Sequence, residues 1–128
     1  MIELPNLLIG ASSKAYLGLA ESLDWARTVA AGLGERGGGE GAYLCMPAAL
    51  LGSVGPALTE AGMLVGAQDV LRFGPGAHTG ETTAEVLAEL GCRLVMIGHP
   101  NARATSTRPW TTAEARRPRP PATESCRS

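Results

Sequence analysis

The sequence is poor in three features that often reveal a protein's class: aromatic side chains, paired cysteines and an excess of one charge. Phe, Trp and Tyr make up only 4% of the 128 residues, so a core has to come from aliphatic side chains and alanine. The formal net charge is −1, which gives no electrostatic reason to expect a nucleic-acid or membrane partner. The three cysteines show no CxxC spacing, which argues against a disulfide framework or a zinc site.

Long apolar runs and a leader are also lacking. The longest uncharged run, 41–59, is interrupted by prolines and glycines and makes a poor membrane span. Met1-Ile2-Glu3 shows no basic segment of the kind that begins a signal peptide. With the odd number of cysteines, these features predict a cytoplasmic protein.

Residues 104–128 lack Val, Ile, Leu, Met, Phe and Tyr altogether, and are rich in Arg, Pro and Thr. Such a composition cannot bury enough apolar surface to offset the entropy of ordering, so this tail is predicted to be disordered. We therefore expect a folded domain at 1–103 and a tail at 104–128. Two origins for the tail stay open, a native extension and the product of a shifted reading frame in a GC-rich gene.

Residues 1–103 alternate short apolar runs with segments of helical period. The runs are typical of buried strands, and the segments between them predict amphipathic helices. Strands separated by helices imply parallel crossovers, so the fold class is α/β with parallel βα repeats, about four units in all. The predicted strands lie at 6–11, 42–46, 63–67 and 94–97, and the predicted helices at 16–33, 47–62 and 82–90.

Three local patterns refine this prediction. Gly55-Pro56 should break or kink the second helix, because proline lacks the amide hydrogen and clashes with the preceding turn. Thr82 with Glu85 forms a capping-box pattern that predicts the start of the third helix. The glycine-rich segment 32–37 matches G-x-G-x-x-G, but it follows a helix where a dinucleotide site follows a strand, so we predict a plain loop.

Polar residues follow the predicted strands, at the edge of the sheet where the ligand-binding sites of parallel α/β folds lie. Lys14, the only lysine, follows the first strand in a Ser-Ser turn, and its compact charge suits a phosphate or carbonyl oxygen. His99 follows the fourth strand. The ordinary alternatives are a solvated loop lysine and a core or capping histidine. His78 is predicted to lie on the surface, and with His99 it lacks a third ligand at recognisable spacing, so no metal site is expected.

Four motifs, in order and spacing, resemble the N-terminal half of triosephosphate isomerases and their sugar-phosphate isomerase relatives. They are Ile9 to Lys14, Gly66 to Val70, Gly76 to Glu81, and Leu90 to His99. The resemblance covers the chain to Arg103. It implies a partial TIM (β/α)8 barrel, no cofactor, and an intramolecular aldose–ketose isomerase of the glyceraldehyde 3-phosphate and dihydroxyacetone phosphate type.

The resemblance also implies roles for single residues. Ser12 and Lys14 would bind the phosphorylated substrate, with Lys14 also facing the developing enolate charge. His99 would be the neutral electrophile that polarises the carbonyl, the part that histidine plays in this family. The loop with Gly76, His78 and Thr79 would reach into a neighbouring subunit of a homodimer.

The chain departs from the family pattern in ways that bear on activity. Ser12 stands where the family has asparagine, and Pro100 to Arg103 replace the usual Ser-Glu-Arg-Arg after the histidine. The family's proton-shuttling glutamate, its lid and its glycine-rich phosphate loops belong to the second half, and no residue here matches them. A chain without the catalytic base has no enediol route, so we expect a truncated protein that is inactive alone.

Two other functions stay open. Ser12 and the segment 16–18 depart from the triose pattern, which allows an isomerase of a longer phosphorylated ketose such as a tetrulose phosphate. The second is a non-catalytic half-barrel that self-associates or aggregates, because an unclosed set of parallel strands leaves strand edges exposed.

Overall fold

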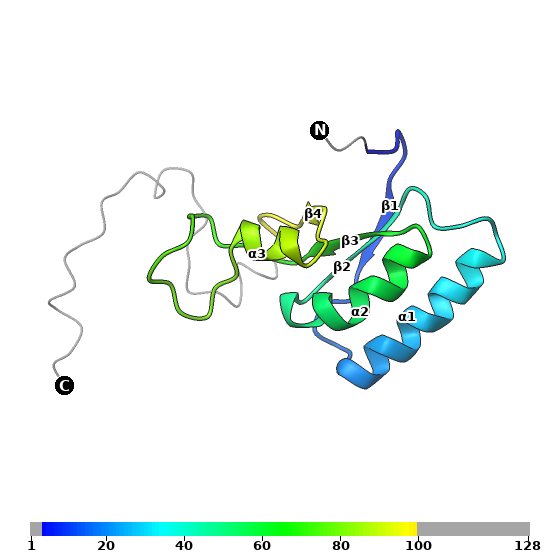
Figure 1. The fold of residues 1–128 in the computed structure, drawn as a ribbon, viewed down its shortest axis with the longest axis horizontal. Coiled ribbons are helices and arrows are strands. Elements are labelled where there is room, and N and C mark those ends of the chain that lie inside the picture. The colour runs from blue at the N-terminus through cyan, green and yellow to red at the C-terminus, as the bar shows by residue number, and fades with distance from the viewer. Residues whose placement is uncertain (1–3, 100–128) are drawn as a thin grey trace, which may run out of the picture. The chain divides into compact units, whose positions relative to one another are not determined.

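The computed structural model describes residues 4–99, and in them strands and helices alternate strictly (Figure 1). The predicted βα repeat is confirmed in type and order. The elements are β1 (Ile9–Ser12), α1 (Leu19–Gly34), β2 (Ala42–Met46), α2 (Ala48–Glu60), β3 (Leu64–Ala67), α3 (Ala84–Glu89) and β4 (Leu94–Val95).

The strands form one parallel sheet in the order β1-β2-β3-β4. Leu44 of β2 pairs with Ala11 of β1 on one side and with Val65 of β3 on the other. Neighbours in the chain are therefore neighbours in the sheet, which is the order of consecutive βα units in a TIM barrel. The carboxyl ends of the strands consequently share one edge of the sheet.

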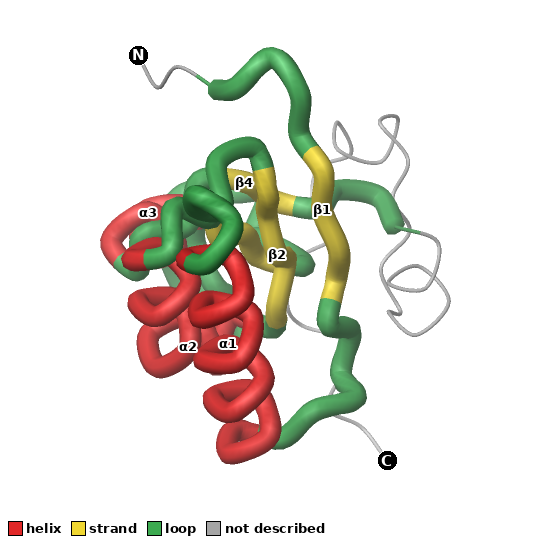
Figure 2. The backbone as a smooth tube through the Cα atoms, turned by 90° about the vertical axis from the view of Figure 1, so that its right-hand side faces the viewer, coloured by secondary structure: helices red, strands yellow, loops and turns green. Residues whose placement is uncertain are grey.

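The core lies between this sheet and its helices, and Figure 2 shows all three helices on the same side of the strands. Side chains alternate along a strand, so every second residue of β2 and β3 faces the helices. The buried side chains of this cluster come from α1, α2, α3, β2 and β3 and from the turns that precede β3 and β4. They are Ala26, Leu44, Met46, Leu51, Val54, Leu58, Met63, Val65, Ala67, Leu87 and Cys92.

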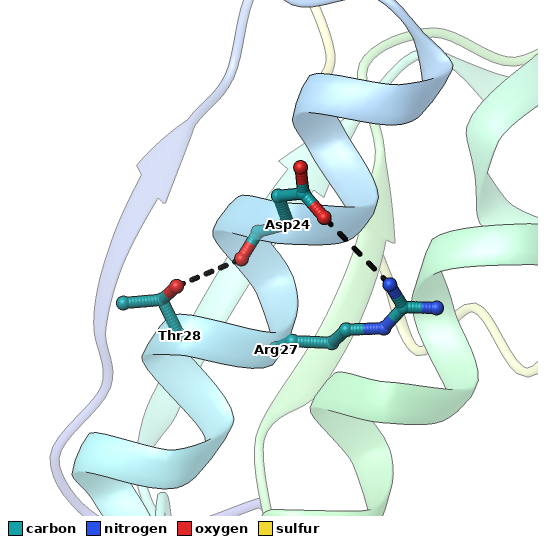
Figure 3. Close-up of polar contacts among 3 residues, drawn as sticks. All are labelled: Asp24, Arg27 and Thr28. Carbon is teal, nitrogen blue, oxygen red and sulfur yellow. Dashed lines mark hydrogen bonds and ion pairs between the residues drawn. The ribbon is translucent and has the colours of Figure 1, made fainter.

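The outer surface of α1 carries a polar network that Figure 3 shows in close-up. Arg27 lies 3.6 Å from the Asp24 carboxylate, and the Thr28 hydroxyl donates to the Asp24 carbonyl oxygen at 2.9 Å. Both side chains of the ion pair are more than two-thirds exposed, so solvent screening leaves the pair little stabilising value. Burial of the opposite side, through Ala26, is what anchors α1.

The face of the sheet turned away from the helices is built around glycine. The Tyr43 ring occupies the space that a side chain on Gly10 would need. On β3, a Cβ atom added at Gly66 would lie 2.8 Å from the Cys45 sulfur and 2.8 Å from the Leu94 carbonyl oxygen. Both neighbours belong to adjacent strands, so glycine at this position lets the strands pair closely.

Gly66→Ala should therefore destabilise the chain by about 1–3 kcal/mol, the usual cost of forcing an extra methyl group into a packed site. The change is measured as a lower midpoint in urea denaturation. Gly34→Ala is the matched control, because nothing lies within 4 Å of the added atom and alanine favours the helix. Equal midpoints for Gly66→Ala and the unaltered chain would contradict the packing argument.

A break of α2 at Gly55-Pro56 and a cap of α3 at Thr82 were both predicted, and both predictions are wrong. The Gly55-Pro56 pair does not break α2, which continues through Pro56 to Glu60. The amide that proline lacks would have bonded the carbonyl of Gly52, and both residues face solvent, where water can satisfy that carbonyl. The cap of α3 is Thr83 rather than Thr82, since the Thr83 side chain accepts the amide of Val86 at 3.4 Å.

The fourth strand is shorter than the apolar run that predicts it. Backbone bonds extend the pairing on both sides, from the Arg93 amide to the Val65 carbonyl and from the Met96 amide to the Ala67 carbonyl. Contacts divide the chain into two units, Met1–Ile97 and Gly98–Ser128. The tail 104–128 lies outside the described residues, so its disorder and the boundary at 103 stay predictions. No helix within 4–99 is long and apolar enough to cross a bilayer.

Candidate functional site at the carboxyl ends of the first three strands

The turn after β1 has an unusual backbone. Ser13 continues the strand pairing, its amide donating to the Cys45 carbonyl at 3.0 Å. Lys14 then adopts φ +52°, the only left-handed non-glycine backbone among residues 4–99. This conformation costs a residue with a Cβ atom about 1–2 kcal/mol. Other contacts must hold it there.

Ser12 and Gln68 supply those contacts. The Ser12 hydroxyl accepts the Lys14 amide at 3.3 Å, and Gln68 Nε2 donates to the Lys14 carbonyl oxygen at 3.0 Å. The same Nε2 lies 3.1 Å from Ser12 Oγ and 3.4 Å from the Cys45 carbonyl oxygen. We call these three contacts of Nε2 the Gln68 clamp.

The chemistry of the acceptors fixes the orientation of the Gln68 amide. Two of the three acceptors are backbone carbonyl oxygens, of Lys14 and Cys45, which can only accept. The NH₂ group must therefore face them, because the amide oxygen in its place would meet two other oxygens. Two amide hydrogens serve three acceptors, so at least one hydrogen is shared.

A pocket of about 200 Å³ lies beside the clamp, between the carboxyl ends of β2 and β3 and the segment 80–82. Gln68 lines it, while Ser12 and Lys14 do not. The carboxylate of Asp69 accepts the neighbouring Val70 amide at 2.9 Å. The full lining consists of Pro47, Ala48, Gln68, Asp69, Val70, Leu71, Gly80, Glu81 and Thr82.

The loop after β3 is held by its own residues. The Leu71 amide donates to the Thr82 carbonyl at 2.7 Å and closes the base of the loop. Within it the Phe73 and His78 rings stack at 5.8 Å between centroids, and the Arg72 guanidinium lies 4.7 Å from the Phe73 centroid. The predicted surface position of His78 is confirmed. Gly76, His78 and Thr79 are all exposed, and their role in a subunit interface stays a prediction.

His99 follows β4 after Gly98, which has φ +71°, and its side chain is half-buried. Both residues belong to the second unit of the chain, whereas Ser12, Lys14 and Gln68 belong to the first. The described geometry therefore brings Ser12 and Lys14 together, and the catalytic role of His99 stays a prediction. Within 4–99 there is no group of three or more His, Cys, Asp or Glu that could hold a metal ion.

Gln68 is the residue of this site that sequence patterns miss. The sequence places it within the motif from Gly66 to Val70, as a polar residue at the end of a strand, and assigns it no role. Its partners Ser12 and Lys14 lie 56 and 54 residues earlier in the chain. No local pattern reports a contact over that separation, so only the fold reveals it.

Cys45, whose carbonyl oxygen accepts a hydrogen bond from Gln68 Nε2, has a buried thiol on the face of the sheet away from the helices. Burial raises the pKa of this thiol above its ordinary value of 9.0, and the nearby Cys92 raises it further. Both effects disfavour the thiolate in the folded chain.

The alkaline stability of the chain should follow from this shift. An unfolded Cys45 ionises near its ordinary pKa of 9.0, while the folded one holds its proton to higher pH. The contribution of this thiol to the free energy of unfolding is therefore fully present below pH 9.0, and it is lost as the pH rises from there through the higher pKa of the folded chain. Urea midpoints measured across the alkaline range should fall in the unaltered chain and fall less in Cys45→Ser, which has no thiol to ionise. Identical pH slopes would exclude Cys45 as the cause.

The sequence of this chain is similar to those of known proteins. A family model described as triosephosphate isomerase matches residues 7–114. The triosephosphate isomerase of Chloroflexus aurantiacus is 35% identical over 96 residues, which cover 75% of this chain and 38% of the relative. That of Caulobacter vibrioides is 40% identical over 99 residues, with 77% and 39% covered. The chain thus spans about two fifths of the length of these relatives.

Proposed function

This chain belongs to the triosephosphate isomerase family, and we propose that its residues form the first part of an aldose–ketose isomerase site for a phosphorylated triose. One observation supports the proposal most directly. The only lysine stands at the carboxyl end of a parallel sheet, in a turn held left-handed by a network of hydrogen bonds. Active sites of barrels built from βα units lie at this end.

Each residue then has a part in the reaction, which moves a proton between adjacent carbons through an enediol. Lys14 binds the phosphate and stabilises negative charge that develops on the substrate oxygen. Ser12 contributes its hydroxyl beside that lysine. His99 polarises the carbonyl, as histidine does in this family.

A base for the carbon-bound proton is the part that these residues do not supply. Asp69 follows β3, but it lines the neighbouring pocket and its carboxylate is engaged with the Val70 amide. In the family the base is a glutamate of the second half of the barrel. We therefore propose that the 128-residue chain by itself does not turn over substrate, since general-base catalysis contributes orders of magnitude in rate.

The experiment is complementation. The chain is mixed with a separate fragment of the Caulobacter vibrioides relative that carries the remaining βα units, and isomerisation of glyceraldehyde 3-phosphate is followed in a coupled assay. We expect turnover from the mixture and none from either part. Turnover by the chain alone would contradict the proposed inactivity. A stable complex of the two parts without turnover would contradict the proposed function.

A longer phosphorylated ketose is a second substrate candidate, favoured by Ser12. Serine is shorter than the asparagine usual at this position, and its hydroxyl is held by the Lys14 amide and Gln68. The same complemented mixture, assayed with a tetrulose phosphate, decides between the two. A higher kcat/KM on the tetrulose phosphate would establish it as the substrate.

A non-catalytic half-barrel is the candidate from another class. Within residues 4–99 the helices lie on one face of the sheet (Figure 2), and β1 and β4 are its edge strands. Ile9 of β1 is 68% exposed. Two copies could pair edge to edge and supply eight strands, which would remove the edges. Sedimentation equilibrium showing a discrete dimer would support this candidate, and a monomer at all concentrations would exclude it.

A further inference from the structure

The left-handed backbone of Lys14 needs a cause outside the turn. Ser12, the last residue of β1, receives the Lys14 amide, but this contact joins residues only two apart in the chain. Gln68 is anchored independently, because its own amide donates to the Met46 carbonyl at 3.2 Å, across from β3 to β2. Its side chain therefore reaches the turn from a fixed strand end.

The geometry points to Gln68 as a positioning residue, and we propose that its amide holds Lys14 in the left-handed conformation and so directs the only lysine toward its ligand. The ligand part of this inference rests on the proposed function, in which Lys14 binds a phosphate. The conformational part rests on the hydrogen bonds alone. Gln68 acts through Lys14 and Ser12 and does not touch the substrate.

The clamp also orients Ser12. A serine oxygen has two lone pairs and one hydrogen, and here the Lys14 amide and Gln68 Nε2 both donate to it. With its lone pairs engaged, the Ser12 hydroxyl must direct its own hydrogen away from the clamp. The turn then presents a hydroxyl donor close in the chain to the Lys14 ammonium, and this pair suits an anionic oxygen.

The single lysine makes the proposal measurable in the full-length chain. Reductive methylation with ¹³C-formaldehyde labels only two amines, Lys14 Nζ and the α-amine of Met1, so Lys14 gives one assignable NMR signal. Inorganic phosphate is the probe, and the α-amine signal is the internal reference. The intraresidue amide–Hα NOE of Lys14, measured on ¹⁵N-labelled chain, reports the sign of φ.

Gln68→Met keeps the length of the side chain and removes its donors. We expect the strong NOE of a positive φ at Lys14 to be lost, and the phosphate affinity at Lys14 to fall about tenfold or more. Leu58→Val is the control for general destabilisation, because Leu58 is a fully buried core residue outside the clamp. It should lower stability and leave both Lys14 signals unchanged.

The outcomes separate this inference from the proposed function. A Gln68→Met chain that keeps the positive-φ signature overturns the positioning role. A Lys14 signal in the unaltered chain that ignores phosphate argues against the proposed function, while the NOE still decides the role of Gln68.

If Gln68→Met fails to fold, Lys14→Gly is added to it. Glycine adopts a positive φ without the steric cost of a Cβ atom. Restored folding supports the positioning role, and no rescue overturns it.

Discussion

Lys14→Ala lowers the kcat/KM of the complemented isomerase by about 10²- to 10³-fold, the usual loss when one preorganised donor to developing charge is removed. The expectation rests on charge as well as position. Lys14 is the only lysine in the chain, and its backbone is fixed by Ser12 and Gln68. An alanine leaves that turn without the cation that we propose binds the phosphate. The coupled assay at saturating and limiting substrate measures the loss in both kcat and KM.

Two variants make this test specific. Lys14→Arg retains the charge, but its planar guanidinium has different donors and reach, so it should recover only part of the activity. Arg27→Ala removes an exposed cation from the outer surface of α1 and should leave kcat/KM unchanged. A loss below about threefold for Lys14→Ala would exclude the charge-stabilising role, because a lost preorganised donor costs far more.

Leu58→Ala should abolish cooperative folding of the chain. Leu58 is 0% exposed and belongs to the cluster between α2 and the sheet. Truncating such a leucine costs about 2–5 kcal/mol through lost burial and the cavity left behind. Whole domains are stable by only about 5–15 kcal/mol, and a sheet with helices on one face, as within residues 4–99, should lie at the low end of that range.

The measurement is guanidinium denaturation followed by near-UV circular dichroism. We expect a sigmoidal transition for the unaltered chain and a shallow, non-cooperative change for Leu58→Ala. Val86→Ala is the control, because Val86 is 45% exposed on α3 and alanine is the better helix former. A cooperative transition at an unchanged midpoint in Leu58→Ala would contradict the assignment of the core.

The repeat of strands and helices could be predicted from the sequence, because the spacing of apolar residues is enough to distinguish the buried strands from the amphipathic helices. The run at 42–46 became a strand with these bounds, and the helix predicted at 16–33 became α1, Leu19–Gly34. The sequence-based prediction failed where a rule about local structure did not take the tertiary surroundings into account. Pro56 was expected to break α2, but it and Gly52 face solvent, so the lost hydrogen bond costs little.

The candidate site was predictable in part. The position of Lys14 after a strand follows from the pattern, because polar residues after parallel strands meet at one edge. Its left-handed backbone does not follow, since lysine seldom adopts it and no sequence pattern indicates the hydrogen bonds that hold it. The cause lies in Gln68, whose contacts with Ser12 and Lys14 exist only once β1, β2 and β3 have paired.

The bond from the Leu71 amide to the Thr82 carbonyl has a consequence for how this protein can change. It ties the two ends of the loop together, so the intervening residues can be lengthened or exchanged at a free-energy cost that grows only slowly with loop size. The Phe73–His78 stack lies wholly inside that closed segment. Transplanting 72–81 between relatives should therefore change the exposed surface of the loop while the strand-end turn keeps its shape.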